Sequence, residues 1–375
     1  MSLDMTKMPK LGFGLMRLPQ NDGKIDIDQV CKMVDAYMEK GLNYFDTAYI
    51  YHDGESENVV KEALTKRYKR EEFMVATKLP AWEMKCEGCR DRILNDQLAK
   101  TGLEYFDFYL LHSLEDGSNY DTYEKYDCFN WGIEKKKEGK IKHFGFSFHG
   151  SPDLLEQVLD KHPEVEFVQI QLNYADWDNQ VVQSGKLYQI LKDRNIPIIV
   201  MEPVKGGTLA NMDPQLEEKF KKVRPDKSVA SWALRFVASL DGVMTILSGM
   251  SNEEQMADNL DTFTNFEPLT AEESAVVQEV VEIMTNLPIV PCTACRYCVP
   301  GCPMKIRIPD VFRGLNTKRI YPDDIRPNFF YNGLTSDSGK AGDCVGCGQC
   351  EGVCPQHLPI IELLKEASEK FDIEM

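Results

Sequence analysis

Two hydrophobic patterns alternate along roughly the first 285 residues of the chain. Short, nearly continuous apolar runs are typical of strands buried on both faces. They predict strands at 10–18, 42–46, 73–78, 106–112, 141–149, 167–172, 196–201 and 242–247. Apolar residues at helical spacing follow each run and predict helices near 30–38, 59–64, 93–98, 121–138, 152–159, 187–191, 229–236, 252–262 and 271–285.

This alternation indicates a parallel sheet connected by crossover helices. Eight strand–helix units over about 285 residues have the size of a closed (β/α)8, or TIM, barrel. An open, doubly wound sheet is the alternative, but the G-x-G-x-x-G turn that usually follows its first strand is missing from the sequence. Gly12 and Gly14 lie inside the first strand, where glycine marks a close approach of neighbouring chain. We therefore predict an α/β barrel over residues 1–287.

Composition narrows the range of partners. The chain has 375 residues and a net charge of −17, which disfavours nucleic acid and anionic membranes as partners. Residues 1–10 lack the apolar core of a signal peptide, and no apolar run approaches the roughly 18 residues needed to span a bilayer. Twelve cysteines in such a chain predict a reducing, cytoplasmic location and metal binding rather than disulfides.

In a (β/α)8 barrel the chemistry lies at the carboxyl ends of the strands. The polar residues predicted there are Asp46, Tyr51, Lys78, His112, Ser147, His149, Gln171, Glu202, Lys205, Ser248 and Gly249. Any one of them alone is better explained as a satisfied polar group or a helix cap. An acid, a phenol, an amine and an imidazole on three successive strand ends favour a catalytic site instead.

These four groups suit the reduction of a carbonyl, or the reverse oxidation of an alcohol. A tyrosine, with a pKa of about 10, is a weak proton donor at neutral pH. A nearby lysine ammonium lowers the pKa of that tyrosine, and a carboxylate paired to the lysine holds it in place. An imidazole can orient the carbonyl oxygen while hydride arrives from a cofactor. Ser147 and Gln171 can hold a carboxamide such as that of nicotinamide.

The barrel sequence resembles the aldo-keto reductases over about residues 8–285. The matching motifs are Leu11-Gly12-Phe13-Gly14, Asp46-Thr47-Ala48 with Tyr51, Ala76-Thr77-Lys78, Leu110-Leu111-His112, Gly145-Phe146-Ser147, and Gln171 with Tyr174. The resemblance implies that Tyr51 is the general acid, that Asp46 and Lys78 tune it, and that His112 orients the carbonyl. It implies an NAD(H) or NADP(H) site formed by Ser147, Gln171, Met201, Lys205, Ser248, Gly249, Met250, Ser251, Gln255 and Asn259.

The sequence departs from this family at three places. Phe148 stands where many members have an asparagine that binds the nicotinamide amide. Gly249 and Gln255 replace a lysine and an arginine that commonly bind an adenosine 2′-phosphate, so we expect NADH to serve at least as well as NADPH. Backbone amides at 248–251 can still bind phosphate where a helix begins. Lys205 is either a charge for the pyrophosphate or a solvated surface lysine.

Residues 288–375 form a second predicted domain, which begins near Pro288 and Pro291. It repeats the spacing C-x2-C-x2-C-x3-C-P, at Cys292, Cys295, Cys298 and Cys302, and at Cys344, Cys347, Cys350 and Cys354. This resembles bacterial ferredoxins, in which the fourth cysteine of each run ligates the other cluster. The resemblance implies two [4Fe–4S] clusters with Cys354 completing the first set and Cys302 the second. Zinc is the alternative metal, but no histidine lies among these cysteines.

The segment 304–343 between the two cysteine runs is too long for a compact ferredoxin. With helix starts at Pro309 and Pro359, it predicts a smaller, mainly helical iron–sulfur domain. Outside this domain, Cys86 and Cys89 follow the third strand and can be a redox pair, half of a metal site, or simply two loop thiols, which we favour. Cys31 and Cys128 lie in helical runs and are expected to be packing residues.

The leading interpretation is an oxidoreductase barrel fused to a two-cluster electron carrier, acting on a small-molecule carbonyl or alcohol. The alternative is an electron-transfer or regulatory subunit whose barrel binds a nucleotide without turning anything over. Nicotinamide transfers two electrons as hydride, whereas a cluster takes one at a time. Exchange between them needs a mediator such as a flavin, bound at Ser248–Ser251 or on a redox partner protein.

Overall fold

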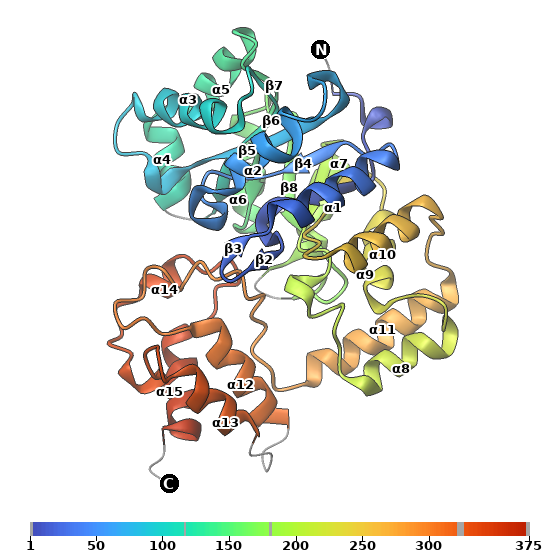
Figure 1. Ribbon diagram of the computed structural model, residues 1–375, viewed down its shortest axis with the longest axis vertical. Helices are drawn as coiled ribbons and strands as arrows, with labels where there is room; N and C mark the ends of the chain where they lie inside the picture. The colour runs from blue at the N-terminus through green and yellow to red at the C-terminus, as the bar shows by residue number, and fades with distance from the viewer. Residues whose placement is uncertain (1–2, 116–117, 180–181, 321–325, 373–375) are drawn as a thin grey trace.

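Figure 1 shows the computed structural model of the chain, which describes residues 3–115, 118–179, 182–320 and 326–372. Eight parallel strands close into a barrel in the order β1-β10-β9-β8-β7-β6-β5-β4, which confirms the predicted fold class. The strands are β1 (Leu11–Gly14), β4 (Tyr44–Asp46), β5 (Met74–Pro80), β6 (Phe106–Leu114), β7 (Ile141–Phe148), β8 (Phe167–Gln171), β9 (Ile198–Met201) and β10 (Val243–Ser248).

Helices surround the barrel on its outside (Figure 1). They are α1 (Ile27–Glu39), α2 (Ser56–Val60), α3 (Cys89–Thr101), α4 (Ser118–Lys125), α5 (Cys128–Lys137), α6 (Pro152–Lys161), α7 (Ser184–Asp193), α8 (Pro214–Val223), α9 (Val229–Ala238), α10 (Glu253–Thr264) and α11 (Ala271–Asn286). Local sequence fixes their starts: the Ser151 side chain caps α6 by accepting from the Leu154 amide, and Pro152 takes the first helical position. Inside the barrel, aromatic rings such as Phe108 and Phe167 pack with centroids 5.3 Å apart.

The structure differs from the predicted elements in three places. The first strand ends at Gly14, and the residues that follow form a turn and a short hairpin, β2 (Gln20–Asn21) with β3 (Lys24–Ile25). The predicted helix at 121–138 is two helices, because Asp127 adopts a left-handed conformation between α4 and α5. Helix α8 was not predicted. Gly12 does mark a close approach, since a Cβ there would lie 2.8 Å from the Leu247 side chain.

The C-terminal domain is mainly helical, as the length of the segment 304–343 predicts. It contains α12 (Ile308–Ile320), α13 (Arg326–Leu334), α14 (Gln349–Gly352) and α15 (Ile360–Phe371). These helices share a core of their own, in which Tyr331 stacks on Phe371 with ring centroids 4.7 Å apart. In Figure 1 the domain lies against the end of the barrel that carries the β2–β3 hairpin.

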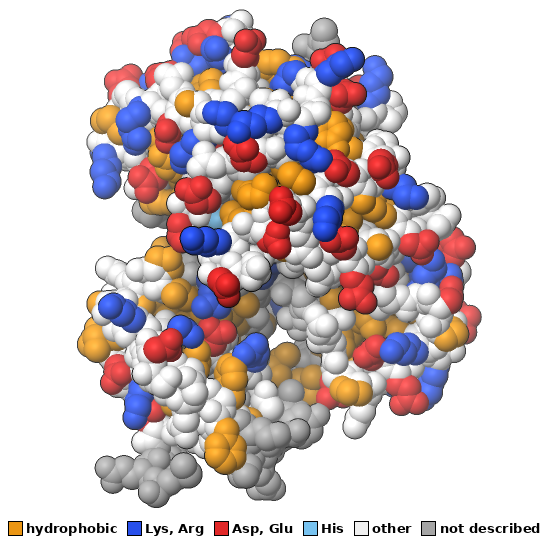
Figure 2. Space-filling model, viewed as in Figure 1, with side chains coloured by type: hydrophobic (Ala, Val, Ile, Leu, Met, Phe, Trp, Pro, Cys, Tyr) orange, Lys and Arg blue, Asp and Glu red, His pale blue; other side chains and the backbone are white. Residues whose placement is uncertain are grey.

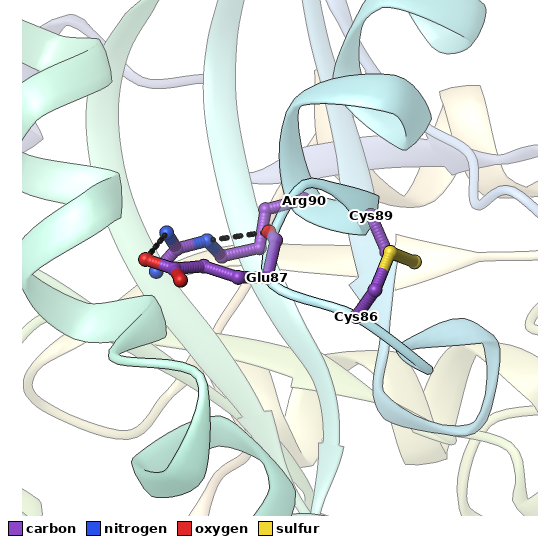
Figure 3. The surroundings of a disulfide bond; sticks show 4 residues. All are labelled: Cys86, Glu87, Cys89 and Arg90. Carbon is purple, nitrogen blue, oxygen red and sulfur yellow. Dashed lines mark hydrogen bonds and ion pairs between the residues drawn. A yellow bond between two sulfur atoms is a disulfide. The ribbon is translucent and has the colours of Figure 1, made fainter.

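Cys86 and Cys89 form a disulfide at the start of α3 (Figure 3). The prediction of two free loop thiols is therefore wrong for this pair, and so is the expectation that the cysteines of the chain form no disulfide. The two Cα atoms lie 5.2 Å apart, within the range that a disulfide requires. Arg90 folds back onto the same turn, and its Nε donates to the Glu87 carbonyl oxygen at 3.2 Å. Cys128 is fully buried and Cys31 partly buried in the barrel core, as expected of packing residues.

Figure 2 shows acidic and basic side chains interspersed over the visible face of the barrel. The same view shows a recess between the barrel and the C-terminal domain. No helix in the described part of the chain is long and apolar enough to cross a membrane. The surface feature that bears on chemistry is therefore the recess at the carboxyl ends of the strands.

Candidate active site

Asp46, Tyr51, Lys78 and His112 converge at the mouth of the barrel. The Lys78 Nζ donates to Asp46 Oδ1 at 2.6 Å and to the Thr47 carbonyl oxygen at 2.8 Å. It also lies 4.9 Å from the centroid of the Tyr51 ring. The imidazole of His112 packs edge-on to that ring, with centroids 6.1 Å apart. The four residues, predicted from three successive strand ends, thus form one cluster.

Strand register explains this convergence. Asp46 on β4 pairs with Ala76 on β5, so Lys78 extends two residues further toward the mouth and reaches back to the Asp46 carboxylate. On the other side, β5 pairs with β6 so that Pro80 lies opposite His112. Because the strands are parallel, all their carboxyl ends open to the same side.

A buried polar network that the sequence did not predict holds β5 in place behind Lys78. The Gln97 Nε2 on α3 donates to the Lys78 carbonyl oxygen at 3.0 Å and to Glu57 Oε1 at 2.9 Å. Glu57 also accepts from Thr77 Oγ1 at 2.7 Å. These side chains are fully buried, so the network fixes the position of the lysine rather than contacting a ligand.

The acid–base properties of Tyr51 differ from the prediction. Burial raises the pKa of Tyr51 well above its usual value of 10.0, and the negative charges of Asp46 and Glu202 raise it further. The expected lowering by the Lys78 ammonium is not found, because that group lies over the ring and is directed toward Asp46. Tyr51 is therefore protonated at neutral pH, which suits an acid and disfavours a base.

Burial favours the uncharged form of each of the other three groups. It raises the pKa of Asp46 and lowers the pKa of Lys78, while the attraction between the two opposes both shifts. Burial and the nearby Lys78 charge lower the pKa of His112 well below 6.5, so its imidazole is neutral. The Nδ1 of His112 has no hydrogen-bond partner, and the Trp82 ring lies 5.2 Å away, centroid to centroid.

The cluster opens into a cavity of about 620 Å³. Its walls come from both domains, which the sequence did not predict. From the barrel they include Gly14, Arg17, Asp46, Tyr51, His112, Ser147, Gln169, Gln171, Met201, Glu202, Ser248, Gly249, Met250, Ser251, Gln255 and Asn259. From the C-terminal domain they include Thr293, Cys295, Tyr297, Pro355 and Gln356. The cavity is thus closed on one side by the cysteine-rich domain.

Tyr297 is the closest link between the two domains at the catalytic cluster. Its hydroxyl lies next to the hydroxyl of Tyr51, and the two affect each other's acidity: Tyr297 acts to lower the pKa of Tyr51, and Tyr51 acts to raise the pKa of Tyr297. Nearby, Arg17 Nη2 donates to the Thr293 carbonyl oxygen at 2.9 Å, and a Cβ on Gly206 would lie 2.1 Å from that oxygen. The only sequence signal for Tyr297 was its place inside the first cysteine run.

The residues proposed for the nicotinamide ring lie in this cavity but are partly engaged. The Ser147 Oγ accepts from the Ser113 amide at 2.7 Å, which leaves its own hydrogen free to donate. The Gln169 Oε1, two residues before Gln171 on β8, is buried and has no hydrogen-bond partner. Gln171 pairs with Gln356 of the C-terminal domain. Met201 lines the cavity next to Gln169, whose Nε2 lies 3.5 Å from the Met201 sulfur.

The opposite end of the cavity is formed by the start of α10. Ser251 N donates to Gln255 Oε1 at 2.8 Å, and Asn259 Nδ2 donates to Ser248 Oγ at 2.7 Å. Glu254 and Asp258 also line this end, which makes it locally acidic. Lys205 does not line the cavity; its Nζ forms a buried ion pair with Asp176, so it is neither a pyrophosphate contact nor a solvated surface lysine.

The eight cysteines of the C-terminal domain surround two cavities. One is lined by Cys292, Cys295, Cys298 and Cys354, and the other by Cys302, Cys344, Cys347 and Cys350. Each cavity takes three cysteines from one run and the last from the other, which is the crossed arrangement that the ferredoxin resemblance implies. Among the described residues, no three His, Cys, Asp or Glu side chains are placed to hold a single metal ion. Thiols spread around a cavity suit a cluster in which each iron binds one cysteine.

Comparison with known proteins agrees with both halves of the molecule. The model of the Aldo/keto reductase family matches residues 10–282, and the model of a 4Fe-4S dicluster domain matches residues 291–358. The chain belongs to the aldo/keto reductase family and carries a fused 4Fe–4S domain.

Among its relatives is the uncharacterized oxidoreductase YqkF of Bacillus subtilis, 25% identical over 301 residues, which cover 72% of this chain and 91% of the relative. L-galactose dehydrogenase of Arabidopsis thaliana is 24% identical over 302 residues, with 75% and 93% covered. The holo form of the aldo-keto reductase AKR11C1 of Bacillus halodurans is a similar solved structure, with a TM-score of 0.58, 25% identity, and 72% and 91% of the two chains covered.

Proposed function

We propose that the barrel reduces a small-molecule carbonyl, or oxidises the corresponding alcohol, with a nicotinamide coenzyme. The observation that carries this proposal is that Asp46, Tyr51 and His112 line one cavity of about 620 Å³, with the fully buried Lys78 paired to Asp46 next to it. A phenol that stays protonated and a neutral imidazole next to it form a pair that can bind and protonate a carbonyl oxygen. In the reverse reaction the same Tyr51 oxygen would take the proton of the alcohol.

The residues of the cavity fit a nicotinamide carboxamide. The Ser147 hydroxyl can donate to the amide oxygen, and the orphaned Gln169 Oε1 can accept from the amide nitrogen. Such a buried polar atom without a partner is costly unless a ligand or water satisfies it. Bound in this way, nicotinamide supplies a hydride to the carbonyl carbon.

The side chains of this chain supply the rest of the reaction. The neutral His112 imidazole donates to the carbonyl oxygen and orients it, and the Tyr51 hydroxyl delivers its proton to that oxygen as charge develops there. The Lys78 ammonium, paired with Asp46, packs against the face of the Tyr51 ring and supports it. Tyr297 lines the cavity from the second domain and reduces the access of water to the site.

We also propose that the two cysteine-lined cavities each hold a [4Fe–4S] cluster. The first cavity and the barrel cavity share Thr293, Cys295 and Gln356 as walls. A cluster at Cys292, Cys295, Cys298 and Cys354 would therefore lie one side-chain layer from the catalytic cavity. This favours clusters that exchange electrons with the barrel or with a partner protein, and a flavin is the mediator that could handle both one and two electrons.

The alternative function is an electron-transfer or regulatory subunit without carbonyl turnover. The shared cavity wall suits that function as well, so turnover must decide between the two. The experiment is steady-state reduction of a panel of small aldehydes and ketones by anaerobically purified protein with NADH. The proposal expects turnover well above the coenzyme-only background. No turnover with NADH or NADPH across the panel, in protein with full iron content, would contradict it.

A further inference from the structure

Both N–H donors of the Gln171 side chain are used, and its contacts with Gln356 cross the domain boundary. Gln356 Nε2 donates to Gln171 Oε1 at 2.8 Å, and Gln171 Nε2 lies 3.3 Å from Gln356 Oε1. The Gln171 Nε2 also donates to Asp176 Oδ2 at 2.7 Å. Gln171 is 2% exposed and Gln356 is 6% exposed, so both amides are buried inside the molecule.

This reciprocal pair has the geometry of the contact expected with the coenzyme. The Gln356 side chain ends in a primary carboxamide, which is also the polar group of nicotinamide. An amide has two N–H donors and one carbonyl acceptor. With one donor on Asp176 and its remaining donor and acceptor on Gln356, Gln171 cannot form the same pair with a second carboxamide.

We propose that Gln356 occupies the Gln171 side of the carboxamide subsite, whose other side is formed by Ser147 and Gln169, and that the coenzyme must displace Gln356 to bind Gln171. This inference rests on the proposed function, because it takes nicotinamide as the ligand of the barrel. The cysteine-rich domain then contributes a residue that competes with the coenzyme. Gln356 is a positioning residue, because it acts on the coenzyme through Gln171.

Displacement of Gln356 must also change the lining of the first cysteine-lined cavity. Gln356 follows the cavity cysteine Cys354 by two residues and lines both that cavity and the barrel cavity. Any ligand that moves Gln356 therefore changes the surroundings of the nearer cluster. If coenzyme binding changes the reduction equilibrium of that cluster by some factor, reduction of the cluster changes the affinity for the coenzyme by the same factor.

The test measures the dissociation constant of NADH by fluorescence titration under anaerobic conditions. Removal of the competing amide in Gln356→Ala should tighten NADH binding by at least about fivefold. The matched control is His357→Ala, since His357 Nε2 lies 3.2 Å from the His149 carbonyl oxygen at the same interface without touching Gln171. This control should bind NADH within about twofold of the wild type.

A double-mutant cycle separates competition from general loosening of the interface. In a Gln171→Ala background, the change Gln356→Ala should no longer tighten NADH binding, because the Gln171 carboxamide, for which Gln356 and NADH compete, has been removed. Equal affinity of the wild type and Gln356→Ala, or equal tightening by His357→Ala, would overturn the inference while leaving the proposed function intact. No NADH binding by any variant would overturn both.

Wild-type protein gives an independent reading that does not depend on how the variants fold. NADH added to dithionite-reduced protein should change the EPR spectrum of the nearer cluster, because Gln356 leaves its place beside Cys354. The spectrum of Gln356→Ala should respond less to the same addition. An unchanged wild-type spectrum at NADH concentrations that saturate the protein would contradict the inference.

Discussion

The hydroxyl of Tyr297, from the cysteine-rich domain, lies next to the hydroxyl of Tyr51 at the mouth of the barrel. Tyr297 lies between Cys295 and Cys298, two of the cysteines that line the first of the two cavities. The proposed proton donor of the barrel thus has a residue of the proposed cluster-binding loop as its neighbour. The domain fusion therefore completes the catalytic cavity and does more than attach a second function to it.

Replacement Tyr297→Phe should lower kcat for carbonyl reduction by about three- to tenfold, because the polar group next to the Tyr51 hydroxyl is lost. The phenyl ring still covers the site, so iron content and visible absorption should stay at wild-type values. Tyr105→Phe, at the opposite end of β6, is a matched control that should leave kcat unchanged. Unchanged kcat in Tyr297→Phe would show that Tyr51 needs no support from the second domain.

The pH dependence of kcat should be flat from about pH 6.5 to about pH 9. As an acid, Tyr51 loses activity only when the pH rises through its pKa, which lies well above 10.0. As a neutral donor, His112 fails only when the pH falls through its pKa, which lies well below 6.5. A loss of kcat centred near pH 8 would show that Lys78 lowers the pKa of Tyr51 in the working enzyme. The measurement is kcat at saturating substrate in buffers of constant ionic strength.

The barrel and its catalytic cluster could be predicted because both follow from repeated local signals. Each strand appears as an apolar run, and parallel strands bring their carboxyl ends together whatever the loops do. Asp46, Lys78 and His112 could therefore be placed in one mouth from sequence alone. The cysteine spacing likewise implied the grouping of Cys354 with the first run, which the first cavity shows.

Contacts between distant residues left no such signal. Gln171 and Gln356 are 185 positions apart, and neither has a neighbour in sequence that points to the other. The pKa of Tyr51 was predicted in the wrong direction because burial and the orientation of the Lys78 ammonium toward Asp46 depend on packing. Lys205 was expected near phosphate or solvent, but a buried partner, Asp176, determines its place.

NADH should be used at least as efficiently as NADPH. The segment Ser248–Gln255 has no lysine or arginine of its own, and Glu254 and Asp258 line the same end of the cavity. The cation near this end is Arg17, which packs beside Gly249, so a 2′-phosphate would lack the usual pair of basic partners and would meet two carboxylates. The measurement compares kcat/KM for the two coenzymes with one aldehyde. Gln255→Arg should shift the ratio toward NADPH by about tenfold, since it adds a charge-assisted contact. A tenfold preference of the wild type for NADPH would contradict this prediction.

Two [4Fe–4S] clusters give about eight irons per chain, and the crossed grouping decides which cluster a single replacement damages. Cys302 lines the cavity of the second run, so Cys302→Ser should perturb the cluster held by Cys344, Cys347 and Cys350 and spare the other. Iron analysis and low-temperature EPR of the reduced protein check this. Cys31→Ser, in the barrel, should keep all the iron. An unperturbed second cluster in Cys302→Ser would refute the crossed grouping.

The most direct test of the account compares wild-type protein with Tyr51→Phe, both purified without oxygen and matched for iron content. The phenylalanine keeps the ring beside Lys78 and His112 but removes the proton that the carbonyl oxygen needs. The account predicts that carbonyl reduction falls roughly 100- to 10,000-fold while the dissociation constant of NADH changes little. Turnover by Tyr51→Phe within about threefold of the wild type would contradict the assignment of Tyr51 as the proton donor.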